Sequence, residues 1–286
     1  MPLEAGPILS ASLGAGLFEA APAKVNLALH VRRRRDDGYH DLETLFAFTC
    51  FGDTLRVQPS EGLSLAITGP FASAAGGGDN LVLRAARALA SAAGAGTGAA
   101  LTLDKHIPVA AGLGGGSADA AAVLRLLNRF WGLNWPLEHL AEIAAALGAD
   151  VPACVFSRTI AGEGRGEVLL PTLVTFTGIP ILLVNPRVAV PTGPVFAAWD
   201  QVDRGSLDLA NWRTARNDLA NPAIGIASVI AEVIAMLIES NSELVRMSGS
   251  GATCFALYAD EQARDLASEI VAARYPRWWS VATTLL

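Results

Sequence analysis

One stretch of the chain, AAGLGGGSADAAAVLRLLN at 110–128, constrains the fold more than any other. It places four glycines in five positions and then continues as an alanine- and leucine-rich run with helical spacing. This pattern predicts a helix that begins near Gly116 or Ser117 and presents its first backbone N–H groups to the glycines. Because glycine has no Cβ, phosphate oxygens can approach such N–H groups closely. A tight strand-to-helix turn is the alternative, but it needs only one or two glycines.

Two common phosphate-binding motifs do not match this stretch. A Walker A loop ends in Gly-Lys-Ser or Gly-Lys-Thr, whereas Gly116 is followed by Ser117 and Ala118. A dinucleotide fingerprint that starts at Gly112 requires glycine where Ser117 stands, within a strand–helix–strand repeat that the chain lacks. The glycine run is therefore a candidate phosphate loop of a different kind.

Composition limits the classes of protein to which the chain can belong. Its 286 residues exceed what one hydrophobic core usually organises, so we expect two domains. With 52% hydrophobic and 17% charged residues, the chain is typical of a globular enzyme and not of a disordered protein. The net charge of -6 predicts neither nucleic acid nor an anionic membrane as a partner. An anionic ligand would need a local site.

Cysteine content and the longest uncharged stretch bear on location. Cys50, Cys154 and Cys254 are odd in number and include no Cys-x-x-Cys, which predicts reduced thiols in a cytoplasmic protein. With only four histidines in the chain, we expect no metal site built from protein ligands. Residues 1–16 lack the positive leader of a secretory signal and are predicted to be a flexible extension. The uncharged stretch 168–186 contains two internal prolines and a glycine, which favour two strands and a turn over a membrane span.

Periodicity and turn signals give a coarse map of helices and strands. In the strand predicted over 24–31, Lys24, Asn26, Ala28 and His30 share one face, which indicates a half-buried strand with a polar side. Further strands are predicted over 43–51, 53–59, 100–105, 167–170, 180–185 and 278–286, with a strand pair around SGSGAT at 248–253. Helices are predicted over 81–93, 137–147, 206–219, 223–239 and 261–273. Strands and helices mix without a regular repeat, which favours an α+β fold.

Three stretches in order resemble the motifs of a known superfamily. PVAAGLGGGSADAA at 108–121 resembles the second motif of the galactokinase, homoserine kinase, mevalonate kinase and phosphomevalonate kinase (GHMP) superfamily. PAKVNLALHVRRRRDDGYHDLETLF at 22–46 resembles its first motif, and MSGSGATCFAL at 247–257 its third. The order PAKVNL, DGYH with LETLF, GLGGGSADAA, GADVP and SGSGAT resembles one family within it, the 4-diphosphocytidyl-2-C-methyl-D-erythritol kinases, over about residues 20–258.

This resemblance implies a fold and a reaction. After the extension it implies an N-terminal α+β ATP-binding domain over 17–160 and a C-terminal α/β sandwich over 161–286, with the active site in the cleft between them. The implied reaction is ATP-dependent phosphorylation of the C2 hydroxyl of 4-diphosphocytidyl-2-C-methyl-D-erythritol, in the non-mevalonate isoprenoid pathway. Alternatives are a GHMP kinase for another small alcohol, such as mevalonate or homoserine, and a non-catalytic sensor of a nucleotide or sugar phosphate. Whether the protein is a monomer or a weak dimer is left open.

The resemblance also implies two catalytic residues. Asp150 of the GADVP motif would take the proton from the substrate hydroxyl, and Lys24 would offset the charge of the transferring phosphate. Asp150 stands before Val151 and Pro152, so it also fits a helix N-cap, and the two roles are compatible. For Lys24 the alternative is a solvated lysine on the polar face of a strand.

Binding residues follow from the same resemblance. The nucleotide would be held by residues of the glycine run: Pro108, Ala110, Gly112, Leu113, Gly114, Gly115, Gly116 and Ser117. The cytidylated substrate would contact Asn26, Tyr39, His40, Thr192 and Phe196, with Tyr39 and Phe196 stacking on the base and His40 reading its edge. Gly249, Ser250 and Gly251 would form a glycine loop near the site, although a tight β-turn is the alternative. Magnesium is expected with ATP, without an assigned protein ligand. The family has a second serine where Ala118 stands, so one hydroxyl is missing here.

Overall fold

The computed structural model describes residues 17–76, 80–94 and 98–286. The extension predicted over 1–16 lies outside this part of the chain, as do residues 77–79 and 95–97. The described residues pack into two compact units, and neither unit is one continuous stretch of sequence. The first unit contains residues up to 23, 52–109 and 114–158, and the second contains 24–51, 110–113 and 159–286. Both units mix helices with sheet, so the predicted α+β class is confirmed.

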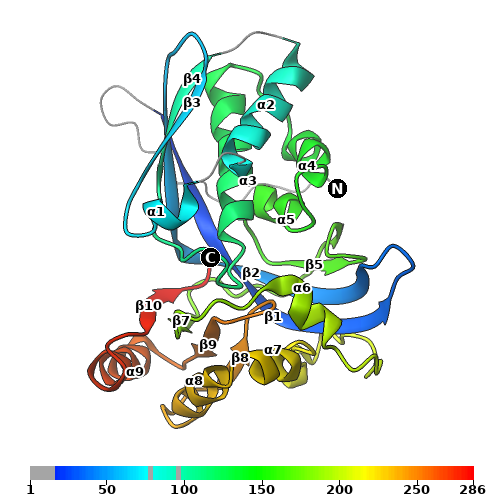
Figure 1. The fold of residues 1–286 in the computed structure, drawn as a ribbon, viewed down its shortest axis with the longest axis vertical. Helices are drawn as coiled ribbons and strands as arrows, with labels where there is room; N and C mark the ends of the chain where they lie inside the picture. The colour runs from blue at the N-terminus through cyan, green and yellow to red at the C-terminus, as the bar shows by residue number, and fades with distance from the viewer. Residues whose placement is uncertain (1–16, 77–79, 95–97) are drawn as a thin grey trace. The chain divides into compact units, whose positions relative to one another are not determined.

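The first unit combines a strand layer with a group of helices (Figure 1). β4 (Ala99–Asp104) lies between β3 (Leu63–Thr68), to which it runs parallel, and the end of β2 (His40–Gln58), to which it runs antiparallel. The helices are α1 (Ala72–Ala75), α2 (Leu81–Ala93), α3 (Gly115–Phe130), α4 (Leu137–Ala145) and α5 (Val151–Phe156). α3 packs against both α2 and α5, and most of its residues are buried, because its many alanines allow neighbouring helices to approach closely.

The second unit contains two groups of paired strands. β1 (Leu17–Arg34) pairs with β2, β2 with β5 (Ile160–Glu163), and β5 with β6 (Val168–Leu170). A separate antiparallel sheet has the order β10 (Trp279–Thr284), β7 (Pro180–Asn185), β9 (Cys254–Leu257) and β8 (Leu244–Met247). Its helices are α6 (Thr192–Ala197), α7 (Ala220–Ile226), α8 (Val229–Ile238) and α9 (Glu261–Arg274), with a short 3-10 turn η1 at Trp212–Thr214. α8 packs against β8 and β9, and α9 against β7 and β10, which builds the core of this unit.

Several predicted elements are confirmed by the structure. The helix predicted over 81–93 is α2 with the same bounds, and the Asn80 side chain caps it by accepting a hydrogen bond from the Val82 N–H at 2.9 Å. The strands predicted over 100–105, 180–185 and 278–286 correspond to β4, β7 and β10. The two predicted strands 43–51 and 53–59 form one long strand, β2, because Gly52 continues the extended backbone.

Three predictions about local structure are wrong. The strand predicted to be half-buried at 24–31 is buried on both faces as part of β1, so its polar side chains lie inside the protein. The helix predicted over 206–219 is replaced by irregular chain with the short turn η1. There, Asp208 accepts a hydrogen bond from the Ala210 N–H, which favours a local turn over helix. The helix predicted over 223–239 is two helices, α7 and α8, which are separated at Ala227 and Ser228.

The structure also bears on membrane and metal sites. Among the described residues, no helix is both long and apolar enough to cross a membrane, and stretch 168–186 contributes β6 and β7. The three cysteines are free thiols. In the described part of the chain no group of three or more histidine, cysteine and acidic side chains could hold a metal ion. The continuous domains predicted at 17–160 and 161–286 stay a prediction.

Candidate active site

The glycine run forms the start of α3, as predicted, one residue earlier than expected. α3 begins at Gly115, and Gly114 precedes it in the left-handed conformation with φ of 60°. The Ala118 N–H donates to the Gly114 carbonyl at 2.8 Å and closes the first turn. Gly112 also has a left-handed φ of 76°, and a Cβ there would lie 2.5 Å from the Ser248 carbonyl oxygen. The backbone alone therefore accounts for glycine at 112 and 114.

Gly116 has no such explanation in the fold. Its backbone is not left-handed, the residue is exposed, and a Cβ built on it would meet nothing within 4 Å. Glycine in a helix costs about 1 kcal/mol of stability relative to alanine. A turn needs no glycine at this position, whereas a ligand that approaches the first N–H groups of α3 benefits from the missing side chain.

A buried charge cluster lies beneath the start of α3 in the first unit. The Lys105 ammonium donates to Asp53 Oδ2 at 2.5 Å and to Asp119 Oδ2 at 2.6 Å, and all three side chains are buried. A Cβ on Gly115 would lie 3.0 Å from Lys105 Nζ, so the cation sits directly against the glycine run. Burial raises the pKa of the Asp119 carboxyl to about 8. The sequence analysis missed this cluster, because its members are 14 and 52 residues apart.

Lys24 and Asn26 are neighbours on β1 in the second unit. Lys24 Nζ donates to Asn26 Oδ1 at 2.7 Å and lies 5.0 Å from the centroid of the Phe46 ring. Asn26 Nδ2 donates in turn to Thr44 Oγ1 at 2.8 Å. Lys24 and Asn26 are each only 3% exposed, so the solvated alternative for Lys24 is wrong. A buried lysine in this position is a candidate for stabilising the negative charge of a bound anion.

The glycine loop around Ser248 is joined to β1 and to residues 110–113 within the second unit. Ser248 Oγ accepts a hydrogen bond from the Asn26 N–H at 3.1 Å and donates to the Gly112 carbonyl at 2.8 Å. The Thr253 N–H donates to the Ala111 carbonyl at 3.1 Å. Three stretches that the sequence analysis singled out separately are thus one hydrogen-bonded network.

The loop itself is a tight turn. Gly249 and Gly251 have left-handed φ values of 56° and 91°, and the Gly251 N–H donates to the Ser248 carbonyl at 3.0 Å. The turn interpretation is therefore correct, and it is compatible with ligand binding. Thr192 and Ser250 share a hydrogen bond between their hydroxyls at 2.9 Å, which joins the start of α6 to this loop.

An aromatic cluster gathers around His40. The His40 and Phe196 ring centroids are 5.0 Å apart, and Trp199 meets the His40 ring edge-on at 5.7 Å. Burial lowers the pKa of His40, and the positive charge of Arg34 lowers it further. The imidazole is therefore neutral near pH 7 and offers one hydrogen-bond donor and one acceptor. Trp199 was not among the residues predicted from the sequence, although it lies three positions after Phe196 at helical spacing.

Tyr39 lies in a different environment from His40. It is 56% exposed, and the guanidinium of Arg165 lies over its ring at 5.0 Å. Its predicted role as a stacking ring stays a prediction. The predicted contacts of Pro108, Ala110 and Leu113 with the nucleotide also stay predictions. Leu113 is fully buried and its carbonyl accepts the Lys24 N–H at 2.9 Å, so its side chain is part of the core.

Asp150 belongs to the first unit and directly precedes α5. Its carbonyl accepts the Cys154 N–H at 3.2 Å, but its side chain makes no capping hydrogen bond to the helix. Its backbone is helical, with φ of -83° and ψ of -17°, instead of the extended conformation typical of a capping residue. Capping therefore does not explain an aspartate at this position. Its role as a base stays a prediction.

Comparison with known proteins shows the family to which the chain belongs. The family described as GHMP kinases N terminal domain matches residues 80–158, and the one described as GHMP kinases C terminal matches residues 204–277. A protein of Rhizorhabdus wittichii named 4-diphosphocytidyl-2-C-methyl-D-erythritol kinase is 53% identical over 276 residues, which cover 93% of this chain and 94% of the relative. This chain belongs to the 4-diphosphocytidyl-2-C-methyl-D-erythritol kinase family.

Solved structures agree with this membership. A crystal structure of 4-(cytidine 5'-diphospho)-2C-methyl-D-erythritol kinase has a TM-score of 0.81 and 35% identity, covering 94% of this chain and 98% of that chain. A homoserine kinase from Cytophaga hutchinsonii has a TM-score of 0.74 over 96% of each chain at 15% identity, which shows the shared fold alone. The GHMP resemblance predicted from five short motifs is confirmed, and the two-domain GHMP fold with it.

Proposed function

We propose that this kinase family member uses ATP to phosphorylate the C2 hydroxyl of 4-diphosphocytidyl-2-C-methyl-D-erythritol, giving the 2-phosphate. The observation that carries the proposal is 53% identity, over nearly the whole chain, to a relative of that name. The likeness to homoserine kinase extends to the fold only, so no observation favours a different alcohol. In the reaction, an oxygen–phosphorus bond forms at the C2 hydroxyl, the bond from the γ-phosphorus to its bridging oxygen breaks, and ADP leaves.

The residues divide the chemistry between them. Asp150 accepts the proton of the attacking hydroxyl, and Lys24, buried against Phe46 and Asn26, offsets negative charge on the transferring group. The N-terminus of α3 and the loop 110–113 provide backbone N–H groups for the phosphates of ATP. A magnesium ion bound with ATP supplies further positive charge to these phosphates. Phosphate oxygens and water would hold most of its coordination sites.

The exposed Gly116 gives a test of the phosphate site. The variant Gly116→Ala is expected to keep or raise the melting temperature, because alanine favours helix, and to raise the KM for ATP about tenfold by placing a methyl group in the ligand's path, a loss of about 1.4 kcal/mol. Gly225→Ala is a matched control, since Gly225 also lies in a helix with open space around its Cβ. An unchanged KM for ATP in Gly116→Ala would show that the phosphates of ATP do not bind at the N-terminus of α3.

The cytidine end of the substrate is proposed to contact the aromatic cluster. Phe196 supplies a ring for stacking, and neutral His40 supplies a donor and an acceptor for the edge of cytosine. Asn26 and Thr192 contact polar groups of the substrate, and Tyr39 covers it from the exposed side. Trp199, packed edge-on against His40, holds the imidazole in place.

His40→Ala tests this pocket. We expect the KM for the cytidylated substrate to rise about 10- to 100-fold, which corresponds to about 1.4–2.8 kcal/mol, with the KM for ATP unchanged. His139→Ala is the control, since His139 is exposed and pairs with Glu142. In the parent, the lowered pKa of His40 predicts a KM that stays constant around pH 7 and rises only at pH below 6.5, where protonation removes the acceptor. Equal KM values in His40→Ala and the parent would place cytosine elsewhere.

The proposed function is tested by a comparison of substrates. Purified protein with magnesium and ATP is assayed for ADP formation with 4-diphosphocytidyl-2-C-methyl-D-erythritol, mevalonate and homoserine. Turnover with the first alone is expected. Turnover with mevalonate or homoserine would contradict the proposed substrate, and turnover with none would favour a sensor.

We further propose a cytoplasmic location, with the alcohol and ATP as partners and without nucleic acid or membrane. Three free cysteines and a net charge of -6 support this assignment. Sedimentation of the purified protein measures its oligomeric state.

A further inference from the structure

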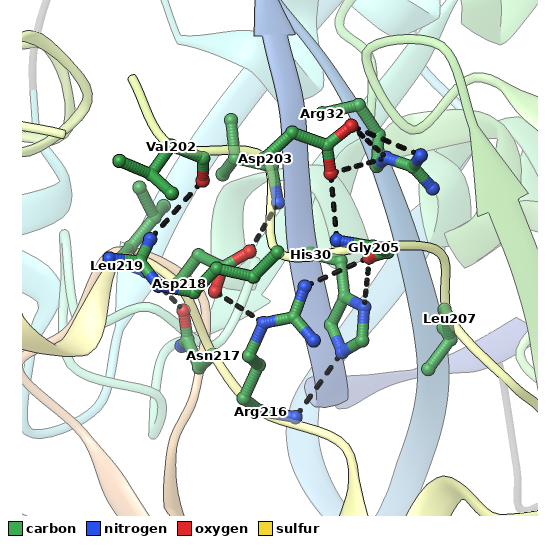
Figure 2. Close-up of polar contacts among 12 residues, drawn as sticks. His30, Arg32, Val202, Asp203, Gly205, Leu207, Arg216, Asn217, Asp218 and Leu219 are labelled. Atoms are coloured by element: carbon green, nitrogen blue, oxygen red, sulfur yellow. Dashed lines mark hydrogen bonds and ion pairs between the residues drawn. The ribbon is translucent and has the colours of Figure 1, made fainter. Parts of the chain in front are cut away.

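A short segment before α7, residues 216–218, is fixed along β1. The Leu29 N–H donates to the Arg216 carbonyl at 2.9 Å, and the Asp218 N–H donates to the Leu29 carbonyl at 2.9 Å, so the segment pairs with β1 like a short parallel strand. Asp218 Oδ2 also accepts the Val31 N–H at 2.8 Å. Figure 2 shows Arg216, Asn217 and Asp218 in this position beside His30.

His30 adds a further bond to this segment. Its Nε2 accepts the Arg216 N–H at 3.3 Å, and its Nδ1 lies 3.2 Å from the Gly205 carbonyl oxygen. This arrangement requires a neutral imidazole with its proton on Nδ1. Burial lowers the pKa of His30, and Arg216 lowers it further, which agrees with the neutral form. The backbone around Asn217 is thus held in place by β1 through several bonds.

The side chain of Asn217 is directed at the glycine loop. Its Nδ2 donates to the Met247 carbonyl at 2.7 Å and to the Gly249 carbonyl at 2.8 Å, while its Oδ1 accepts the Leu219 N–H at 2.9 Å. Both amide N–H groups and the amide oxygen are therefore engaged, and the side chain is 9% exposed. One buried amide fixes two carbonyls of the loop that carries Ser248.

These bonds determine which way the loop presents its N–H groups. In a trans peptide the C=O and N–H point in opposite directions. Since Asn217 holds the Gly249 carbonyl, the N–H of Ser250 points away from Asn217. Among the described residues no acceptor bonds this N–H, so it can donate to a ligand. The Ser248 N–H is bonded to the Thr253 carbonyl at 2.9 Å, which closes the loop on its other side.

We infer that Asn217 is a positioning residue for the phosphoryl-transfer site, which rests on the proposed kinase function. It holds the peptide between Gly249 and Ser250 so that the Ser250 N–H faces a phosphate oxygen. Ser248 then ties the same loop to Asn26 and to Gly112. The side chains of Asn217 and Ser248 therefore connect β1, residues 110–113 and the loop 248–253. None of the sequence motifs described above contains Asn217.

Asn217→Asp tests this role with almost no change in side-chain shape. A carboxylate cannot donate to the two carbonyls and repels them, so we expect kcat per folded protein to fall about 100-fold, comparable with the loss of one backbone donor to a developing oxyanion. At lower pH the introduced carboxyl becomes protonated and can donate one hydrogen bond. The ratio of variant to parent kcat is therefore expected to rise as pH falls, which a purely structural defect would not produce.

Charged side chains on neighbouring elements do not disturb this comparison. The charged ones are Arg216 and Asp218 in the same segment, Lys24 on β1 and Arg246 on β8, and the neutral His30 on β1 is a further titratable group. All five are present in both proteins, so their own titration largely cancels in the ratio. The folded fraction of each protein is measured by circular dichroism at every pH used.

A matched control separates positioning from general loss of stability. Asn128 is also a buried amide that bonds a backbone carbonyl and a backbone N–H, both of Trp135, near the end of α3. Asn128→Asp is expected to lower the melting temperature but to keep kcat per folded protein within about twofold of the parent, a difference below about 0.5 kcal/mol. A similar kcat in Asn217→Asp and Asn128→Asp, or a pH-independent ratio, would overturn the inference. An inactive parent would instead overturn the proposed function.

Discussion

Asp150→Asn is expected to lower kcat by about 10²- to 10⁴-fold, the usual contribution of a positioned general base. The amide keeps the size of the side chain but cannot accept the proton of the C2 hydroxyl. ATP binding is expected to stay unchanged, because the proposed nucleotide contacts lie on the glycine run. Single-turnover kinetics with calorimetry of ATP binding measures both quantities.

A second aspartate provides the control for this variant. Asp260 caps α9, where its side chain accepts the Ala263 N–H at 2.8 Å, whereas Asp150 makes no such bond to α5. Asp260→Ala should therefore cost about 1 kcal/mol of unfolding free energy and leave kcat intact. Asp150→Asn should instead lower kcat. An Asp150→Asn protein that turns over at the parent rate would exclude Asp150 as the base.

Lys24→Met is expected to lower kcat about 10²- to 10³-fold, because it removes a buried cation beside the transferring phosphate while filling the same volume. The ammonium in the parent is held by Asn26 and lies against Phe46. The KM for both substrates should change much less than kcat, since the charge acts mainly on the transition state. Rapid-quench measurement of the phosphoryl-transfer step tests this split.

The other lysine of the chain gives a contrasting result. Lys105 is buried against the side chains of Asp53 and Asp119, so Lys105→Met leaves both without their hydrogen-bond donor and Asp53 without its cation, and should cost about 3–5 kcal/mol of unfolding free energy. For Lys24→Met, kcat is expressed per folded protein, so that a change in stability does not enter the comparison. Parent-like kcat in folded Lys24→Met would show that Lys24 does not act on the phosphate.

Sequence reasoning predicts local structure well where one strong signal dominates. The α2 helix follows from its apolar spacing and its Asn80 cap, and the start of α3 follows from the glycine run. The stretch 206–219 was mispredicted as a helix, because Asp208 accepts hydrogen bonds from the Ala210 N–H and the Asn211 side chain in a local turn that competes with helix.

The site was only partly predictable for a different reason. The motifs led to Lys24, Asn26, His40 and Phe196, which the structure places in one unit and joins in two pairs. The supports of these residues are pairings across long sequence distances, such as Asn26 with Ser248 over 222 residues and Lys105 with Asp53 over 52. No local pattern encodes such pairs. The same limit hid the burial of Lys24, because alternation along a strand does not reveal whether the polar face is covered.

The most direct test of the account is the phosphorus-31 NMR spectrum of the product formed by the parent enzyme from 4-diphosphocytidyl-2-C-methyl-D-erythritol, ATP and magnesium. We expect one new phosphomonoester signal from a phosphate on the C2 oxygen, beside the unchanged diphosphate of the substrate, in amounts equal to the ADP formed. A phosphate on another hydroxyl, or ADP formed without a phosphorylated alcohol, would contradict the proposed reaction.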